Sequence, residues 1–91
     1  MAESQDMHQA QTHVVANQDS GVILERLIAM GKAYRVEGNQ WQAMEIFWEI
    51  VEDYPEAPQS AEARNILLEF ARNYERNGAR HLARDIYERL L

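Results

Sequence analysis

The side chains best able to do chemistry in this chain are three histidines and fifteen carboxylates, and the chain has no cysteine. The lack of thiols excludes disulfides, thiolate metal sites and cysteine nucleophiles. His8 and His13 stand five residues apart in a polar segment near Met7, a spacing that does not bring imidazoles together on a metal ion. His81 belongs to no partner motif. We therefore expect no metal site and no cofactor.

Catalysis by the carboxylates would need a special environment. General acid–base chemistry by two acids depends on an apolar pocket that separates their pKa values. No pair of acids in this chain stands in such an apolar stretch, and the sequence has no glycine-rich phosphate loop and no nucleophile elbow. We predict that the protein is not an enzyme and has no catalytic residues.

Composition limits the partners. The 91 residues suit one small domain, and 46% of them are hydrophobic, which is enough for a core. The net charge of −6 argues against nucleic acid and against an anionic membrane surface. Apolar runs are short, and the first twenty residues hold three acids and no Lys or Arg, so neither a spanning helix nor a secretory signal is expected. We predict a cytoplasmic protein with no membrane insertion; a secreted form whose signal had been removed would look the same.

The elements that must position the polar side chains are helices. Apolar periodicity predicts helices at about 21–37, 40–53, 60–77 and 79–91, and no β-type alternation appears. The segment 1–19 is polar and is predicted to be a disordered or weakly helical leader.

Two kinds of signal separate the predicted helices. Gly38 and Gly78 stand where a helix must reverse. Pro55 and Pro58 break the chain in the middle, because proline lacks an amide donor and disfavours helix in the residue before it. Short connections make neighbouring helices antiparallel. The predicted fold class is therefore all-α, with two antiparallel helical hairpins behind a flexible N-terminal leader.

The two halves of this domain repeat one another with a shift of 40 residues. The shift aligns tyrosine, glycine, alanine and apolar positions: Leu27 with Leu67, Met30 with Phe70, Tyr34 with Tyr74, Gly38 with Gly78, Ala43 with Ala83, Phe47 with Tyr87, and Ile50 with Leu90. Gly31 and Ala43 are small where two antiparallel helices would cross. The domain 20–91 thus divides into repeat one, about 20–55, and repeat two, about 60–91.

This pattern resembles the tetratricopeptide repeat family. The family signature has a large residue, then Leu-Gly, Tyr, Ala, Phe and Pro at fixed offsets, matched in repeat one by Leu27, Met30-Gly31, Tyr34, Ala43, Phe47 and Pro55. The resemblance implies a fragment of a right-handed α-solenoid. The period exceeds the family's value of about 34 residues because of the linker Glu56–Ala61, and this lengthened linker resembles small bacterial members.

Apolar stripes indicate which faces pack. Helix 40–53 has one stripe for its own hairpin and a second stripe for the following repeat, made of Trp41, Met44, Trp48 and Val51. Both tryptophans are therefore assigned to the core. On the last helix the equivalent positions are polar, which predicts a capping surface that ends the array. The first helix keeps Val22, Ile23 and Ala33 outward, to be covered by Val14 and Val15 of the leader or by a second copy.

Ligands of the tetratricopeptide family lie in a concave groove lined by the first helix of each hairpin. Carried over position by position, the resemblance implies a partner-binding set there: Ile28, Lys32, Arg35, Asn65, Leu68, Arg72 and Arg76. Four cations on an acidic protein predict an acidic segment or a C-terminal carboxylate as ligand. The alternative is a solvated helix face with local pairs such as Arg72–Glu75 and Arg72–Glu69.

Two functions follow from these patterns. The first is a protein–protein interaction adaptor or scaffold that binds a peptide or protein segment in the concave groove. The second is a structural self-assembly module that forms a homodimer or larger homo-oligomer through its repeat faces. Residues 21–56 hold seven acids and three bases, a net charge of −4, whereas residues 57–91 hold five acids and six bases, a net charge of +1. Halves of opposite sign favour pairing between copies.

Overall fold

The computed structural model describes residues 20–91, and all of their regular structure is helical. A first helical stretch covers residues 20–36, followed by α2 (Gln40–Asp53), α3 (Pro58–Arg76) and α4 (Arg80–Leu90). The predicted all-α class is confirmed, and the predicted bounds are right to within two residues. The predicted leader 1–19 lies outside the described residues. Across residues 20–91, none of the helices has the length and apolar character needed to cross a membrane.

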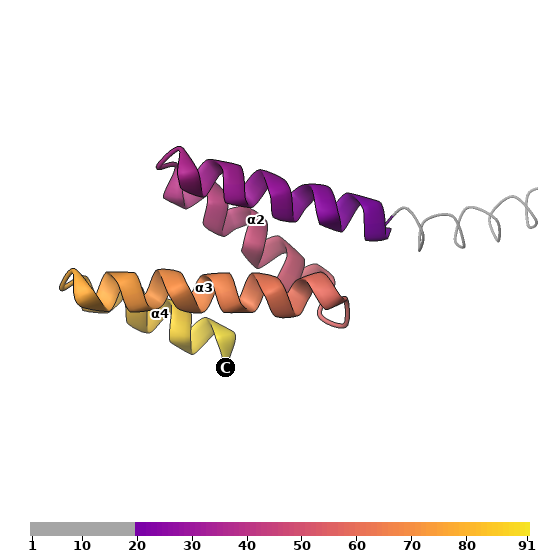
Figure 1. Ribbon diagram of the computed structural model, residues 1–91. Coiled ribbons are helices and arrows are strands. Elements are labelled where there is room, and N and C mark those ends of the chain that lie inside the picture. The colour runs from indigo at the N-terminus through magenta and orange to yellow at the C-terminus, as the bar shows by residue number, and fades with distance from the viewer. Residues whose placement is uncertain (1–19) are drawn as a thin grey trace, which may run out of the picture.

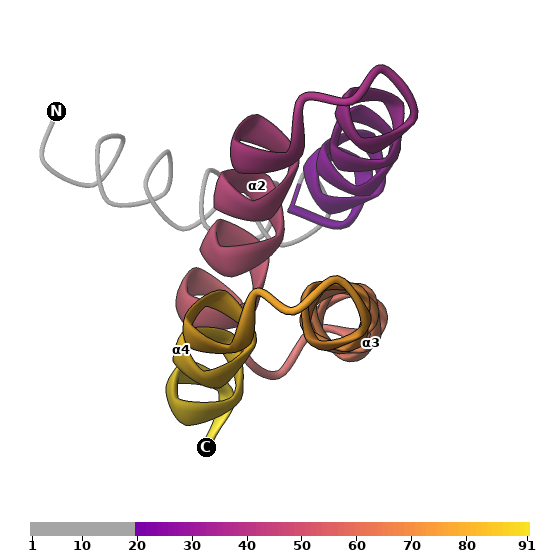
Figure 2. The same cartoon turned by 90° about the vertical axis from the view of Figure 1, so that its left-hand side faces the viewer.

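The helices form two hairpins in two layers. Residues 20–36 turn back into α2, and α3 turns back into α4, as Figure 1 shows. In Figure 2 residues 20–36 and α3 lie in one layer, and α2 and α4 lie in the other. The hairpins are joined through α2, which packs on α3 as well as on its own hairpin partner. The prediction of two antiparallel hairpins is therefore confirmed.

The same turn closes both hairpins. The amide of Asn39 donates to the carbonyl of Tyr34 at 2.8 Å, and Ala79 repeats this bond to Tyr74 at 2.8 Å. Gly38 and Gly78 have φ values of +86° and +82°, the left-handed conformation that glycine adopts without a steric penalty. This paired hydrogen-bond pattern at a helix end satisfies carbonyls that the helix itself leaves free.

The connection between the hairpins is shorter than the sequence predicts. Helix α3 begins at Pro58 rather than near Ser60. A proline in the first helical turn costs nothing, because that amide has no partner inside the helix. Ala57 before it is extended, with φ −74° and ψ 146°, as expected for a residue that precedes proline. The hydroxyl of Ser60 is buried and forms no hydrogen bond with the described residues.

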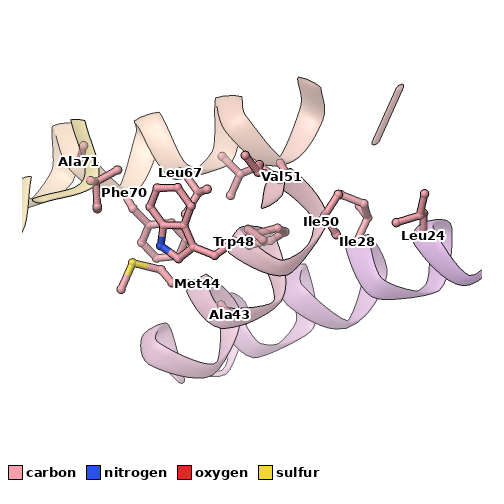
Figure 3. Packing of buried hydrophobic residues seen from close by; sticks show 14 of the residues in the cluster. Leu24, Ile28, Ala43, Met44, Trp48, Ile50, Val51, Leu67, Phe70 and Ala71 are labelled. Atoms are coloured by element: carbon pink, nitrogen blue, oxygen red, sulfur yellow. The ribbon is translucent and has the colours of Figure 1, made fainter. Parts of the chain in front are cut away.

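One continuous core runs through both hairpins (Figure 3). Phe47, Ile50 and Leu67 are fully buried, and the rings of Phe47 and Phe70 lie 6.4 Å apart between their centroids. Gly31 makes the closest approach, since a Cβ atom added there would lie 2.6 Å from Cζ of Phe47. The small residue predicted at this helix crossing is therefore required by contact with a buried ring.

The two tryptophans of α2 differ. Trp48 is buried as predicted, but Trp41 is 68% exposed, so its assignment to the core is wrong. Trp41 lies in the first turn of α2 and borders a hollow that Tyr74 of α3 and Leu82 of α4 also line.

Candidate functional site

Residues 20–36 and α3 lie side by side in one layer, and their side chains line a groove. One hollow of about 490 Å³ is lined by residues that include Lys32, Arg35 and Asn65. A second hollow of about 290 Å³ is lined by Arg35, Glu69, Arg72, Asn73 and Arg76. The two hollows share Arg35 and Glu69, so they are adjacent parts of one groove along both hairpins.

The groove brings together five of the seven residues predicted to bind a partner, namely Lys32, Arg35, Asn65, Arg72 and Arg76. The other two do not line it. Ile28 is only 3% exposed and lies beside Ile50 in the core (Figure 3), because the first helical stretch presents this position to α2. Leu68 is half-buried. Ile28 is therefore wrong as an exposed apolar contact, and the groove residues that contact solvent are mainly polar.

Three polar bridges join the two hairpins across the groove. Lys32 Nζ lies 3.4 Å from Glu62 Oε2, and Arg35 Nη1 donates to Glu69 Oε2 at 2.7 Å. Gln59 Nε2 donates to Glu25 Oε1 at 2.7 Å. The two salt bridges neutralise Lys32 and Arg35, and all three bonds hold the groove face of the first hairpin against α3. Sequence reasoning missed them because each partner lies 30 or more positions away.

Arg35 is held by two contacts at once. Besides the bond to Glu69, its guanidinium lies 4.7 Å above the ring centroid of Phe70, a cation–π geometry. The side chain is therefore oriented by the protein before any ligand binds, and it lines the same hollow as Arg72 and Arg76.

The C-terminal end of the groove is cationic. Arg72 and Arg76 stand one helical turn apart on α3, and both are exposed. Arg76 donates to the side-chain oxygen of Asn73, a neutral partner. Arg72 forms no salt bridge within residues 20–91, so the pairs with Glu69 and Glu75 that were named as examples for a solvated helix face are not formed. Glu69 instead binds Arg35, and Glu75 accepts a hydrogen bond from the Tyr87 hydroxyl.

A third hollow, of about 190 Å³, lies in the other layer between α2 and α4. Its walls include Trp41, Met44, Trp48 and Ile86, and Arg89 borders it. The Arg89 guanidinium lies 4.2 Å above the Trp48 ring centroid and forms two hydrogen bonds, of 2.8 and 2.9 Å, with the Glu52 carboxylate. The sequence does not predict this contact of Arg89 with Trp48 and Glu52, apart from the apolar character of Trp48, because Glu52 and Arg89 are 37 residues apart.

The titratable groups with perturbed pKa values are structural. Hydrogen bonding from Arg89 lowers the pKa of Glu52. The hydrogen bond to Glu75 raises the pKa of Tyr87, and burial raises the pKa of Tyr74, whose hydroxyl donates to Gln40. Within the described part of the chain no group of His and acidic residues is arranged to hold a metal ion, and His81 is exposed. The prediction that His8 and His13 form no metal site concerns positions outside the described residues.

Comparison of the chain with protein-family models, characterised proteins and solved structures found no match. The assignment to the tetratricopeptide family, the bacterial origin and the cytoplasmic location therefore stay predictions that depend on the residues of the chain itself.

Proposed function

We propose that this chain is a protein–protein interaction adaptor of the tetratricopeptide kind, and that it binds an acidic peptide segment in the groove between residues 20–36 and α3. The observation that carries the proposal is the cationic end of the groove. Arg72 and Arg76 lie beside Arg35 there, on a protein whose net charge is −6.

The groove divides into two parts by charge. Near Lys32 the cations already have carboxylate partners, so an incoming acid would have to displace Glu62 or Glu69. Near Arg72 and Arg76 no carboxylate forms a salt bridge with either arginine within residues 20–91. Hydrogen bonds to charged partners contribute about 1.5–3 kcal/mol each, which makes this end the place where an acidic side chain or a terminal carboxylate gains most.

Polar side chains provide the remaining contacts. Asn65 lines the groove beside Lys32, and Asn73 lies between the two arginines. An amide side chain can donate to and accept from the backbone of an extended peptide. The groove thus supports recognition of a peptide by its charge and its backbone, with no cofactor and no covalent chemistry.

The test is charge reversal at the cationic end. The double variant R72E/R76E is titrated with a fluorescein-labelled oligoglutamate peptide that has a free C-terminal carboxylate, and binding is followed by fluorescence anisotropy. We expect at least a tenfold rise in Kd, equivalent to a loss of about 1.4 kcal/mol or more. Binding to the unaltered chain should also weaken as salt is added.

The matched control is R26E/R80E, which makes the same change in net charge at exposed arginines outside the groove. The C-terminally amidated peptide separates recognition of the terminal carboxylate from recognition of acidic side chains. Undiminished binding by R72E/R76E, or equal weakening by the control variant, would refute the proposal.

A further inference from the structure

The hollow at the C-terminal end of the groove is positively charged. It is lined by Arg35, Glu69, Arg72, Asn73 and Arg76, so three cations share it with one carboxylate. Glu69 binds Arg35 at 2.7 Å and balances that charge. Arg72 and Arg76 form no salt bridge within residues 20–91. The lining therefore has an excess of two positive charges.

The acids beside this hollow are bound to other partners. Glu62 pairs with Lys32 at 3.4 Å in the adjoining hollow. Glu75 lines a different hollow with residues of α4, and it accepts a hydrogen bond from the Tyr87 hydroxyl. The excess positive charge is consequently left for a ligand to balance.

The guanidinium groups are placed so that one ligand group can meet all of them. Arg72 and Arg76 stand four residues apart on α3, a spacing that puts two side chains next to each other on a helix surface. Arg76 is held by its hydrogen bond to the side chain of Asn73. Arg35 belongs to the other hairpin and is held over the Phe70 ring, 4.7 Å from its centroid. The three arginines border one hollow of about 290 Å³.

Charge distinguishes the anions that this hollow can take. One carboxylate carries a single negative charge and would leave one positive charge unbalanced. Two carboxylates would bring two charges, but two side chains would have to be ordered at once, and like charges held close together repel. A phosphate monoester brings about −1.5 to −2 charges at pH 7 and three acceptor oxygens in one group. Arginine also pairs with phosphate through two parallel hydrogen bonds.

We propose that the cationic end of the groove binds a phosphorylated serine or threonine of an extended partner peptide. This inference rests on the proposed function, because it specifies the acidic group that the same groove takes. The groove favours a peptide over free phosphate, since it continues to Asn65 and Lys32, which can contact neighbouring peptide residues. A nucleotide is not favoured, because none of the described residues lining the hollow is an aromatic on which a base would stack.

The test uses three fluorescein-labelled oligoglutamate peptides with amidated C-termini, which differ only at one central position: glutamate, serine or phosphoserine. Binding to the full chain is followed by fluorescence anisotropy. At pH 7.5 the Kd of the phosphoserine peptide should be at least tenfold below that of the glutamate peptide, because the second charge adds its own attraction to both arginines. The serine peptide should bind most weakly. At pH 5.5 about a quarter of the phosphate groups keep their second charge, since their second pKa is about 6, so the advantage should fall to about threefold.

Variants of the two unbalanced arginines locate the phosphate. R72Q and R76Q should each reduce the advantage of the phosphoserine peptide at least threefold, because a group with two charges loses more attraction than a group with one. The double variant should abolish the advantage. Both arginines are exposed, so the fold is retained. The matched control is R26Q, which removes the same charge from an exposed arginine outside the groove and should leave the advantage unchanged.

The outcomes separate this inference from the proposed function. If the glutamate peptide binds but phosphoserine gives no advantage at pH 7.5, the inference is overturned and the proposed function stands. If none of the peptides binds, both fail. An advantage that R26Q reduces as much as R76Q does would also overturn the inference. So would displacement of the phosphoserine peptide by inorganic phosphate, or by vesicles containing phosphatidylinositol phosphate, at a lower phosphate concentration than by the unlabelled phosphoserine peptide.

Discussion

Phe47 occupies the space that a side chain at position 31 would need. An added Cβ atom at Gly31 would lie 2.6 and 2.7 Å from two atoms of the Phe47 ring, and that ring is fully buried. The ring cannot move aside without disturbing its neighbours, because protein interiors are packed as densely as organic crystals. The glycine therefore fixes how closely the first helical stretch approaches α2.

We predict that Gly31→Ala destabilises the protein although alanine is the better helix former. Overpacking costs about 1–3 kcal/mol, whereas the gain in helix propensity is about 1 kcal/mol, so a net loss of up to about 2 kcal/mol is expected in urea unfolding. Gly21→Ala is the control, since nothing lies within 4 Å of a Cβ atom there, and it should be neutral or stabilising. Replacing the ring with the smaller side chain of Phe47→Leu should reduce the loss of unfolding free energy caused by Gly31→Ala, because the two sites are in contact. A stabilised Gly31→Ala variant would contradict the contact.

Single residues show where sequence reasoning succeeded and where it failed. Gly31 and Ala43 were predictable because a helix crossing needs small side chains at known positions. Trp41 and Ile28 were not, since periodicity tells which side of a helix a residue occupies but not how far the neighbouring helix extends. Trp41 is exposed because it lies in the first turn of α2, and Ile28 is buried because α2 crosses the first stretch at that level.

At the scale of the elements, Arg89 ties the last helix to α2. Its guanidinium covers the Trp48 ring and forms two hydrogen bonds with Glu52. A bidentate pair of this kind has defined geometry, but both side chains are about half exposed, so solvent weakens the attraction.

We predict that Glu52→Gln loses about 0.5–1 kcal/mol of unfolding free energy at neutral pH. Arg89 lowers the pKa of Glu52 below its ordinary value of 4.5, so the folded state favours the ionised carboxyl. That contribution is present above the unfolded-state pKa and is lost as the pH falls through the lowered folded-state pKa. Unfolding by urea at neutral pH and in acid should therefore show the unaltered protein and Glu52→Gln converging below about pH 4.5.

The control is Glu88→Gln, which removes the pair with Arg84 inside α4 but no link between helices. It should change the stability less than Glu52→Gln does. A difference between the unaltered protein and Glu52→Gln that grows in acid would contradict the assigned role of Arg89.

The elements themselves were largely predictable, but their cross-links were not. Glycines and prolines mark helix ends through backbone conformation, which is a local property, so the bounds were right to within two residues. The bonds between hairpins, Arg35–Glu69, Gln59–Glu25 and Tyr74–Gln40, each join residues 34 positions apart. Charged and amide side chains have many candidate partners at that separation, and only the packing of α2 on α3 selects among them.

At the scale of the whole molecule, the hairpins share one core rather than having one each. Leu67 of α3 is fully buried in the cluster that includes Phe47 and Trp48 of α2, as well as Ile86 of α4. We predict that Leu67→Ala costs about 2–5 kcal/mol, because it leaves a cavity that the surrounding helices cannot fill. Amide hydrogen exchange should show that both hairpins lose protection together.

Leu91→Ala provides the comparison for that experiment, since Leu91 is fully exposed and should not affect stability. Two separate unfolding transitions, one for each hairpin, would contradict the shared core. The groove depends on the same arrangement, because its cations come from both hairpins and only the packing of one hairpin on the other places Arg35 beside Arg72. Sequence positions indicated which residues line it, but the pairing of Lys32 and Arg35 with carboxylates of α3 required the three-dimensional structure.

The tight reversals at Gly38 and Gly78 also affect how the chain folds. Across residues 20–91, the side-chain hydrogen bonds between helices join positions no more than 37 apart. Closing such short loops carries a small entropic cost, so either hairpin can form first and the other can add to it. Domains built from nearby contacts reach the native state in about microseconds to milliseconds. Once all four helical segments are available, Trp48 and Phe70 are therefore exposed to water only briefly, which limits aggregation during refolding.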